Sequence, residues 1–194
     1  MYNSSIKGQG QRRHYTEHRE IPGKVFFHDM SKSPYHKAFE KADVIFSEIA
    51  WAYGFPLFNE RAGNQPNQYA EYLSNINKLV QTLAVPAFLI CGKPAARYFP
   101  GAQARPIKIT LAGTNMSGCT LYVWNYDKPT PDTTSALIQQ LRQEFDCCLD
   151  FSCGYGEHLL SFNDFIASDI DRDCLTYLTE IYEVKRDGET EEGN

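Results

Sequence analysis

This 194-residue chain is organised around the stretch Leu149-Asp150-Phe151-Ser152-Cys153-Gly154-Tyr155-Gly156-Glu157-His158. An apolar run ends in Asp150 and then breaks at Cys153 into Gly-x-Gly, which predicts a buried strand that opens through a tight glycine turn into a helix. Glycines in such a turn let a ligand approach the bare backbone, and amide groups at a helix start offer hydrogen-bond donors. The stretch therefore predicts a nucleotide-binding turn, although an ordinary strand-turn-helix unit has the same pattern.

Three more strand-like runs end in an acid. The run from Asp164 to Asp171 predicts a strand whose Asp169 stands where nucleotide-binding folds hold a ribose diol. Earlier in the chain, Asp29 follows an apolar run that begins at Lys24, and Glu48 ends a run that begins at Ala42. Because ligands bind beyond the carboxyl ends of parallel strands, we expect all four acids to meet at one crevice.

Strands that alternate with helices predict an open, mostly parallel α/β sheet. Apolar residues at helical spacing, Tyr72 among them, are expected to lie in the core rather than at a cofactor. The remaining predicted elements are a loop and short helix over Ser31–Lys41, an amphipathic helix over Gln65–Leu83, a buried parallel strand over Val85–Cys91, strands over Ile107–Leu111 and Thr120–Trp124 separated by a hairpin loop over Ala112–Gly118, a helix capped by Asp132, Thr133 or Ser135, and a last helix over Cys174–Val184.

Composition places the chain among globular proteins with one α/β domain. Hydrophobic residues make up 42% and charged residues 22% of the sequence. No apolar run is long enough to span a bilayer, and the first residues lack the apolar segment of a secretory signal. Six cysteines in mostly apolar contexts fit a reducing compartment. We therefore expect a cytoplasmic protein that makes no contact with a membrane.

Net charge and cysteine spacing argue against two classes of ligand, namely a phosphate backbone bound without help and a metal ion. The net charge of −5 argues against broad, unaided binding to a phosphate backbone. Cys147, Cys148, Cys153 and His158 could be drawn into a metal site, but no Cys-x-x-Cys pair supports it, so we expect no metal.

In the order of these pieces, the chain resembles the amino-methyltransferases that use S-adenosylmethionine to methylate exocyclic amines of adenine or cytosine in DNA or RNA. The resemblance is to the circular permutation in which the catalytic half precedes the cofactor half. It covers residues 22–184 as a single methyltransferase-like domain, with a flexible arm at 1–21 and an acidic tail at 185–194. It implies a Rossmann-like methyltransferase fold, namely a mostly parallel seven-stranded sheet with helices on both faces and one antiparallel hairpin strand.

The cofactor half carries most of the match. Residues 149–156 are similar to the family's loop Leu-Asp-Pro-Phe-x-Gly-x-Gly, with Phe151 and Ser152 in place of Pro and Phe. Thr133 and Thr134 stand where the family has Lys-Pro. The resemblance implies that the methionine part of the cofactor is faced by Asp150, Cys153, Gly154 and Gly156, that Asp169 takes the ribose hydroxyls, and that Asp29 lies near the adenine ring.

The catalytic half is similar but altered. Glu48-Ile49-Ala50-Trp51 stands where the family has Asp-Pro-Pro-Tyr or Asp-Pro-Pro-Trp. The resemblance implies that Glu48 orients the amine and that Trp51 stacks on the base. The longer side chain moves the carboxylate by over an ångström, which can cost on the order of a hundredfold in rate. Loss of both prolines also removes two fixed backbone angles.

The leading hypothesis is methyl transfer from S-adenosylmethionine to an exocyclic amine of a nucleobase in nucleic acid. The main alternative is a catalytically inactive, methyltransferase-like binding or regulatory subunit, which needs a protein partner or a second copy. A third hypothesis is that the same fold catalyses a different reaction, in which Glu48 acts as a general base. The insert at 52–84 leaves no evident target-recognition domain. A protein of this kind that acts on nucleic acid would read little of its sequence, act on single strands or flipped bases, or take its specificity from a partner.

Overall fold

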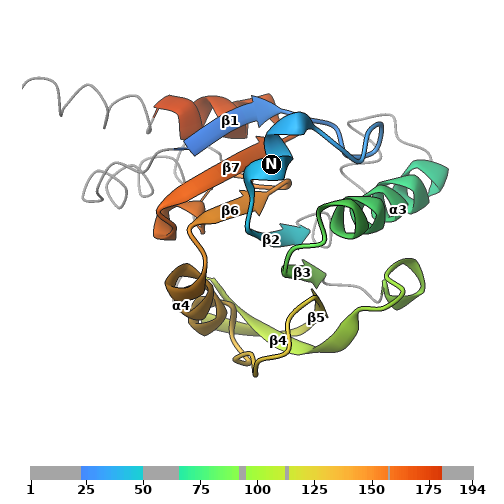
Figure 1. Cartoon of the computed structure of the whole chain (residues 1–194), viewed down its shortest axis with the longest axis vertical. Coiled ribbons are helices and arrows are strands. Elements are labelled where there is room, and N and C mark those ends of the chain that lie inside the picture. The colour runs from blue at the N-terminus through green and yellow to red at the C-terminus, as the bar shows by residue number, and fades with distance from the viewer. Residues whose placement is uncertain (1–22, 50–65, 92–94, 112–113, 157, 181–194) are drawn as a thin grey trace, which may run out of the picture.

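A computed structural model describes residues 23–49, 66–91, 95–111, 114–156 and 158–180 (Figure 1). One seven-stranded sheet runs through it in the order β1-β7-β6-β2-β3-β5-β4. Neighbouring strands pair in parallel except at β5, which is antiparallel to both β3 and β4. The predicted sheet with one antiparallel strand is confirmed. Its strands are β1 (Gly23–Phe27), β2 (Val44–Ile49), β3 (Ala87–Cys91), β4 (Gln103–Leu111), β5 (Thr114–Trp124), β6 (Cys147–Asp150) and β7 (Asp164–Asp169).

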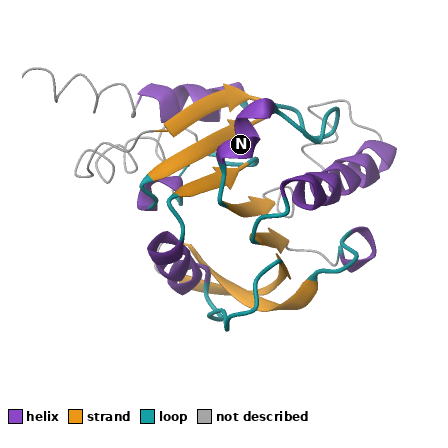
Figure 2. Cartoon of the chain, viewed as in Figure 1, coloured by secondary structure: helices purple, strands orange, loops and turns teal. Residues whose placement is uncertain are grey.

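Helices cover both faces of the sheet, as predicted (Figure 2). One face packs against α3 (Pro66–Leu83) and the short helix η1 (Lys37–Lys41). The other packs against α4 (Thr134–Glu144), the single turn η3 (Leu159–Ser161) and a helical segment at 172–180. A further turn, η2 (Ala96–Tyr98), follows β3.

The central strands are apolar because both of their faces are covered. Along β2, Val44 and Phe46 belong to one core cluster, whereas Ile45 and Ile49 belong to the other. Every residue of β3 is buried. Such near-continuous apolar runs are typical of parallel strands between two layers of helices.

The amphipathic helix predicted before β3 is α3. Leu73, Ile76, Leu79 and Val80 are fully buried, and burial of each contributes about 1.5–3 kcal/mol. The helix connects two parallel neighbours, so it runs back against the strand direction. Its first half therefore lies at the carboxyl edge of the sheet.

The prediction of a helix directly after the glycine turn is wrong. The described residues between Phe151 and Asn163 form turns and the single turn η3. Because β6 and β7 are parallel neighbours, the chain must travel back along the sheet within this connection. The seven residues at 157–163 would span only about 10 Å as an α-helix, whereas a strand the length of β7 spans roughly 20 Å. A more extended path is required.

The prediction of a hairpin loop over Ala112–Gly118 is also wrong, because it makes the loop too long. β4 continues to Leu111 and β5 begins at Thr114, so most of the expected loop is strand. The pairing shifts register between Ile107 and Ile109. This irregularity places small and polar residues inside a strand, where composition alone indicates a loop.

The carboxyl edge between β6 and β2 is the switch point of the sheet. From β6 the chain continues to β7 on one side, and from β2 it continues to β3 on the other. In open α/β sheets, ligands bind beyond the strand ends at such a point. The arm at 1–21 and the tail at 185–194 lie outside the described residues. Within the part of the chain described, no helix combines the length and apolarity that a bilayer crossing requires.

Candidate functional site

The four acids predicted for the site stand at the carboxyl ends of four neighbouring strands. Asp150 ends β6, Asp169 ends β7, and Glu48 is the penultimate residue of β2. Asp29 lies two residues beyond the end of β1, the neighbour of β7. The four acids therefore lie along one continuous edge of the sheet, and their roles there stay predictions.

Asp150 is a buried carboxylate with polar partners from two segments. It is 3% exposed, and its Oδ1 accepts hydrogen bonds from Ser47 Oγ at 2.7 Å and Ser152 N at 3.0 Å. Burial raises its pKa to about 7, although these hydrogen bonds and nearby His158 act in the opposite direction. A strongly raised pKa in a carboxylate at a switch point marks a functional-site candidate.

Asp169 joins the end of β7 to the glycine turn. Its Oδ2 accepts from Gly154 N at 2.8 Å and its Oδ1 from Asp171 N at 2.9 Å. Burial also raises the pKa of Asp169. A carboxylate oxygen has two lone pairs, so each oxygen can accept one more hydrogen bond.

The two glycines of the turn have different roles. Gly154 has a φ of +51°, and no atom lies within 4 Å of the position where a Cβ would stand. Gly156 has a φ of +72°, but its Cβ position lies 2.7 Å from Leu178 Cδ1. Gly154 thus leaves space beside the backbone, whereas Gly156 allows close packing against the 172–180 segment.

A Gly156→Ala variant should be destabilised by roughly 2 kcal/mol, because the residue combines a positive φ with a steric clash. Urea unfolding of the variant against the unmodified protein measures this loss. Gly101→Ala is the matched control, since Gly101 also has a positive φ but open space around its Cβ position. Equal losses in the two variants would rule out a packing role for Gly156.

Cys153 does not turn its thiol toward the edge. The side chain belongs to the core cluster beneath the turn, and its Sγ donates to Gly154 O at 3.6 Å. Burial raises the pKa of the thiol well above its ordinary range. Any contact of Cys153 with a ligand would therefore use the backbone.

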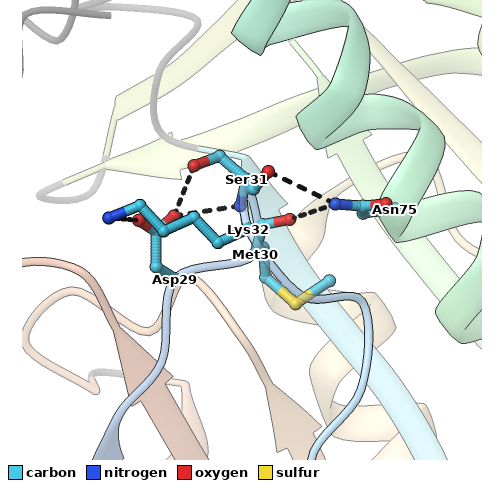
Figure 3. A network of polar contacts seen from close by, with 5 residues as sticks. All are labelled: Asp29, Met30, Ser31, Lys32 and Asn75. Carbon is cyan, nitrogen blue, oxygen red and sulfur yellow. Dashed lines mark hydrogen bonds and ion pairs between the residues drawn. The ribbon is translucent and has the colours of Figure 1, made fainter.

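Asp29 organises the loop after β1 (Figure 3). Its Oδ1 accepts from Ser31 N at 3.0 Å and from Ser31 Oγ at 2.6 Å, and its Oδ2 lies 3.4 Å from Lys32 Nζ. The carboxylate thus holds its own loop in one conformation.

Glu48 faces His158, the last residue of the stretch 149–158. Glu48 Oε1 lies 3.3 Å from His158 Nε2, and both side chains are about one-quarter exposed. The contact lacks hydrogen-bond geometry. The ring of His158 also packs edge-on against Phe46, with centroids 5.4 Å apart. Trp51, the other predicted catalytic residue, lies outside the described residues.

Apolar surface lies beside Asp169. Ile170, the next residue, is 36% exposed, and Phe27, the register partner of Asp169 in β1, is 44% exposed. The Arg172 guanidinium stacks over the Phe27 ring at 4.4 Å. Among the described side chains, no group of three or more His, Cys, Asp or Glu residues could hold a metal ion.

Sequence reasoning missed several polar residues at this edge, namely Ser47, Tyr72, Asn75 and His158. Ser47 occupies an apolar run and Tyr72 fits the helical core pattern, so neither gave a distinct signal. His158 lies in the stretch 149–158, where its nearness to the cysteines points only to a metal ligand.

Comparison with known proteins identifies the fold. No protein-family model matches the chain, and no curated protein matches its sequence. The crystal structure of M1.HpyAVI matches with a TM-score of 0.50 at 14% identity, covering 83% of this chain and 99% of that one. TTHA0409 from Thermus thermophilus, described as a candidate DNA modification methylase, has a TM-score of 0.45 at 10% identity, covering 85% and 95%. The match to M1.HpyAVI confirms the predicted methyltransferase fold, and at this identity it shows the fold alone.

Proposed function

We propose that this protein binds S-adenosylmethionine at the carboxyl ends of β6 and β7 and transfers its methyl group to an exocyclic amine of a nucleobase in nucleic acid. The observation that carries the proposal is the hydrogen bond between the glycine turn and Asp169, in which Gly154 N donates to the carboxylate at 2.8 Å. A glycine turn tied to an acid at the next strand end is the arrangement that holds a ribose beside bare backbone.

The residues present fit this cofactor. Asp169 has acceptor capacity left for the ribose hydroxyls. The open space beside Gly154 leaves room for a ligand against the backbone. Exposed Ile170 offers an apolar surface for a purine ring next to Asp169, and Asp29 stands on the adjoining loop. Asp150 supplies negative charge for the ammonium group of the methionine part.

The chemistry that the bound cofactor supplies is an electrophilic methyl group on a sulfonium centre. The protein's part in the proposed reaction is orientation. Glu48 accepts hydrogen bonds from the amine, and Trp51 stacks on the base, so that the nitrogen lone pair is directed along the line of transfer. Such positioning of two reactants can supply about 7–11 kcal/mol of a reaction barrier.

The order of elements supports the proposed circular permutation. β2, which carries Glu48, precedes the glycine-turn unit in sequence but lies beside β6 in the sheet. In this scheme the catalytic half comes first, and the chain returns to the centre of the sheet to build the cofactor half.

A second candidate function is a cofactor-binding subunit without catalysis. The position of His158 favours it, because the imidazole stands 3.3 Å from one oxygen of the proposed orienting carboxylate, in the space that an amine would need there. Such a subunit would act with a protein partner or a second copy of this chain.

Titration calorimetry of the full chain with S-adenosylmethionine tests the shared part of both proposals. We expect one binding site per chain, and no heat at millimolar cofactor would overturn both. Incubation with labelled donor and a mixture of DNA and RNA then separates them. Label in nucleic acid supports the enzyme, whereas binding without any transfer supports the subunit.

A Glu48→Ala variant should lose about a hundredfold or more of the transfer rate, because the amine is no longer oriented. Its affinity for S-adenosylmethionine should change less than about twofold, since Glu48 is assigned to the acceptor. Single-turnover transfer and calorimetry measure the two quantities. Glu71→Ala, at an exposed position of α3, is the matched control. Full transfer activity in Glu48→Ala would refute the assigned role.

A further inference from the structure

The first half of α3 faces the carboxyl edge on the side opposite the 172–180 segment (Figure 1). The apolar face of the helix is buried in the core. Two polar side chains, Tyr72 and Asn75, instead reach loops that belong to the proposed cofactor site. These contacts join segments that are far apart in the sequence.

Asn75 connects α3 to the loop after β1 (Figure 3). It is 3% exposed, and its Nδ2 donates to Met30 O at 2.9 Å and to Ser31 O at 3.4 Å. Ser31 in turn donates through both its backbone and its hydroxyl group to Asp29. A chain of hydrogen bonds thus runs from the helix to the proposed adenine-side carboxylate.

Tyr72 connects the same helix to the glycine turn. Its hydroxyl group lies 2.9 Å from Ser152 Oγ, and Ser152 N donates to Asp150 Oδ1. Burial raises the pKa of Tyr72, and the charges of Asp169 and Asp150 raise it further. The phenol therefore stays neutral and remains able to donate.

We propose that Tyr72 and Asn75 are positioning residues that fasten the loop at 29–32 and the turn at 151–154 to one helix, so that both sides of the cofactor site keep a fixed separation. This inference rests on the proposed function, because it assigns both loops to cofactor binding. Neither side chain is assigned a contact with the cofactor.

The hydrogen bonds can be removed without removing the core of the helix. The apolar residues of α3 remain in Tyr72→Phe, which keeps the ring and loses only the hydroxyl group. Loss of one anchor should free one loop while the sheet stays intact, because a hydrogen bond holds only the segment that it joins. Fixed binding geometry lowers the ordering cost of binding, so a freed loop should weaken affinity.

The test uses the full chain and S-adenosylhomocysteine as the probe. Tyr72→Phe should weaken binding by about five- to tenfold, the size expected for one hydrogen bond. Hydrogen exchange should become faster at 151–156 and stay unchanged in β2 and β3. Tyr126→Phe is the matched control, since Tyr126 also makes a side-chain hydrogen bond through its hydroxyl group, to the Glu144 carboxylate, but beyond the end of β5 at the opposite edge of the sheet. The control should leave affinity unchanged.

Ser152→Ala and the double variant complete a cycle. Because both single changes remove the same contact, the double variant should bind about as weakly as either one. Asn75→Ala should instead speed exchange at 28–33. Unchanged exchange in these loops would overturn the inference, as would changed exchange together with unchanged affinity. If the unmodified protein does not bind the probe, the proposed function fails, whereas the exchange measurement still decides whether the helix holds the loops.

Discussion

An Asp169→Ala variant should lose affinity for S-adenosylmethionine by at least about a hundredfold. The proposed contact with a ribose diol consists of two charge-assisted hydrogen bonds, whose loss at about 1.5–3 kcal/mol each would account for a change of this size. The substitution also leaves the amides of Gly154 and Asp171 without their acceptor. The turn should therefore be less ordered as well as less able to bind. Titration calorimetry at matched protein concentrations measures the loss.

Two further variants separate the proposed ribose contact from general effects of charge. Asp132→Ala removes an exposed carboxylate and its 3.5 Å ion pair with Lys108, far from the turn, and should bind like the unmodified protein. Asp169→Asn keeps one acceptor oxygen and should lose less affinity than Asp169→Ala. A folded Asp169→Ala protein that bound the cofactor normally would exclude the site at the end of β7.

The edge that carries the candidate site was predictable because strand ends leave strong local signals. Asp150 and Asp169 each end an apolar run, and a glycine turn follows the first of them. Parallel pairing then fixes that the two acids share an edge, whichever loops connect the strands. The outline of the sheet followed from the same pattern.

The contacts between elements were not predictable, because they depend on packing. The spacing of apolar and aromatic residues along α3 is the same for Tyr72, whose hydroxyl group contacts Ser152, as for a residue that lies only in the core. The contact between Glu48 and His158 joins residues that are adjacent only after β2 pairs with β6. The missing helix after Gly156 reflects the length of chain available for the return path, which local propensity does not record.

An Asp150→Asn variant should be more stable than the unmodified protein at pH 8, by roughly 4 kcal/mol. Burial raises the pKa of this carboxyl group from 3.8 to about 7, so the folded protein carries an unfavourable buried charge at pH 8. At about 1.36 kcal/mol per pH unit, that difference corresponds to the stated gain. Asparagine keeps an oxygen that can accept from Ser47 and Ser152. Cofactor affinity should fall, since the variant lacks the negative charge that we propose for the ammonium group.

The pH dependence gives the sharper test of this buried charge. Between about pH 4 and pH 7 the folded protein holds a proton at Asp150 that the unfolded chain releases, so stability falls as the pH rises. In the variant this fall should be absent, and the two proteins should approach equal stability near pH 4. Urea unfolding at several pH values measures the difference, and Asp127→Asn, at an exposed position, should show the unmodified dependence. A parallel course of both stability curves would mean that Asp150 is not held at a raised pKa. If Asp150 is retained for its charge, the Asp150→Asn variant should be more stable and should bind the ligand more weakly. The buried charge destabilises the folded protein, and only ligand binding offsets that cost.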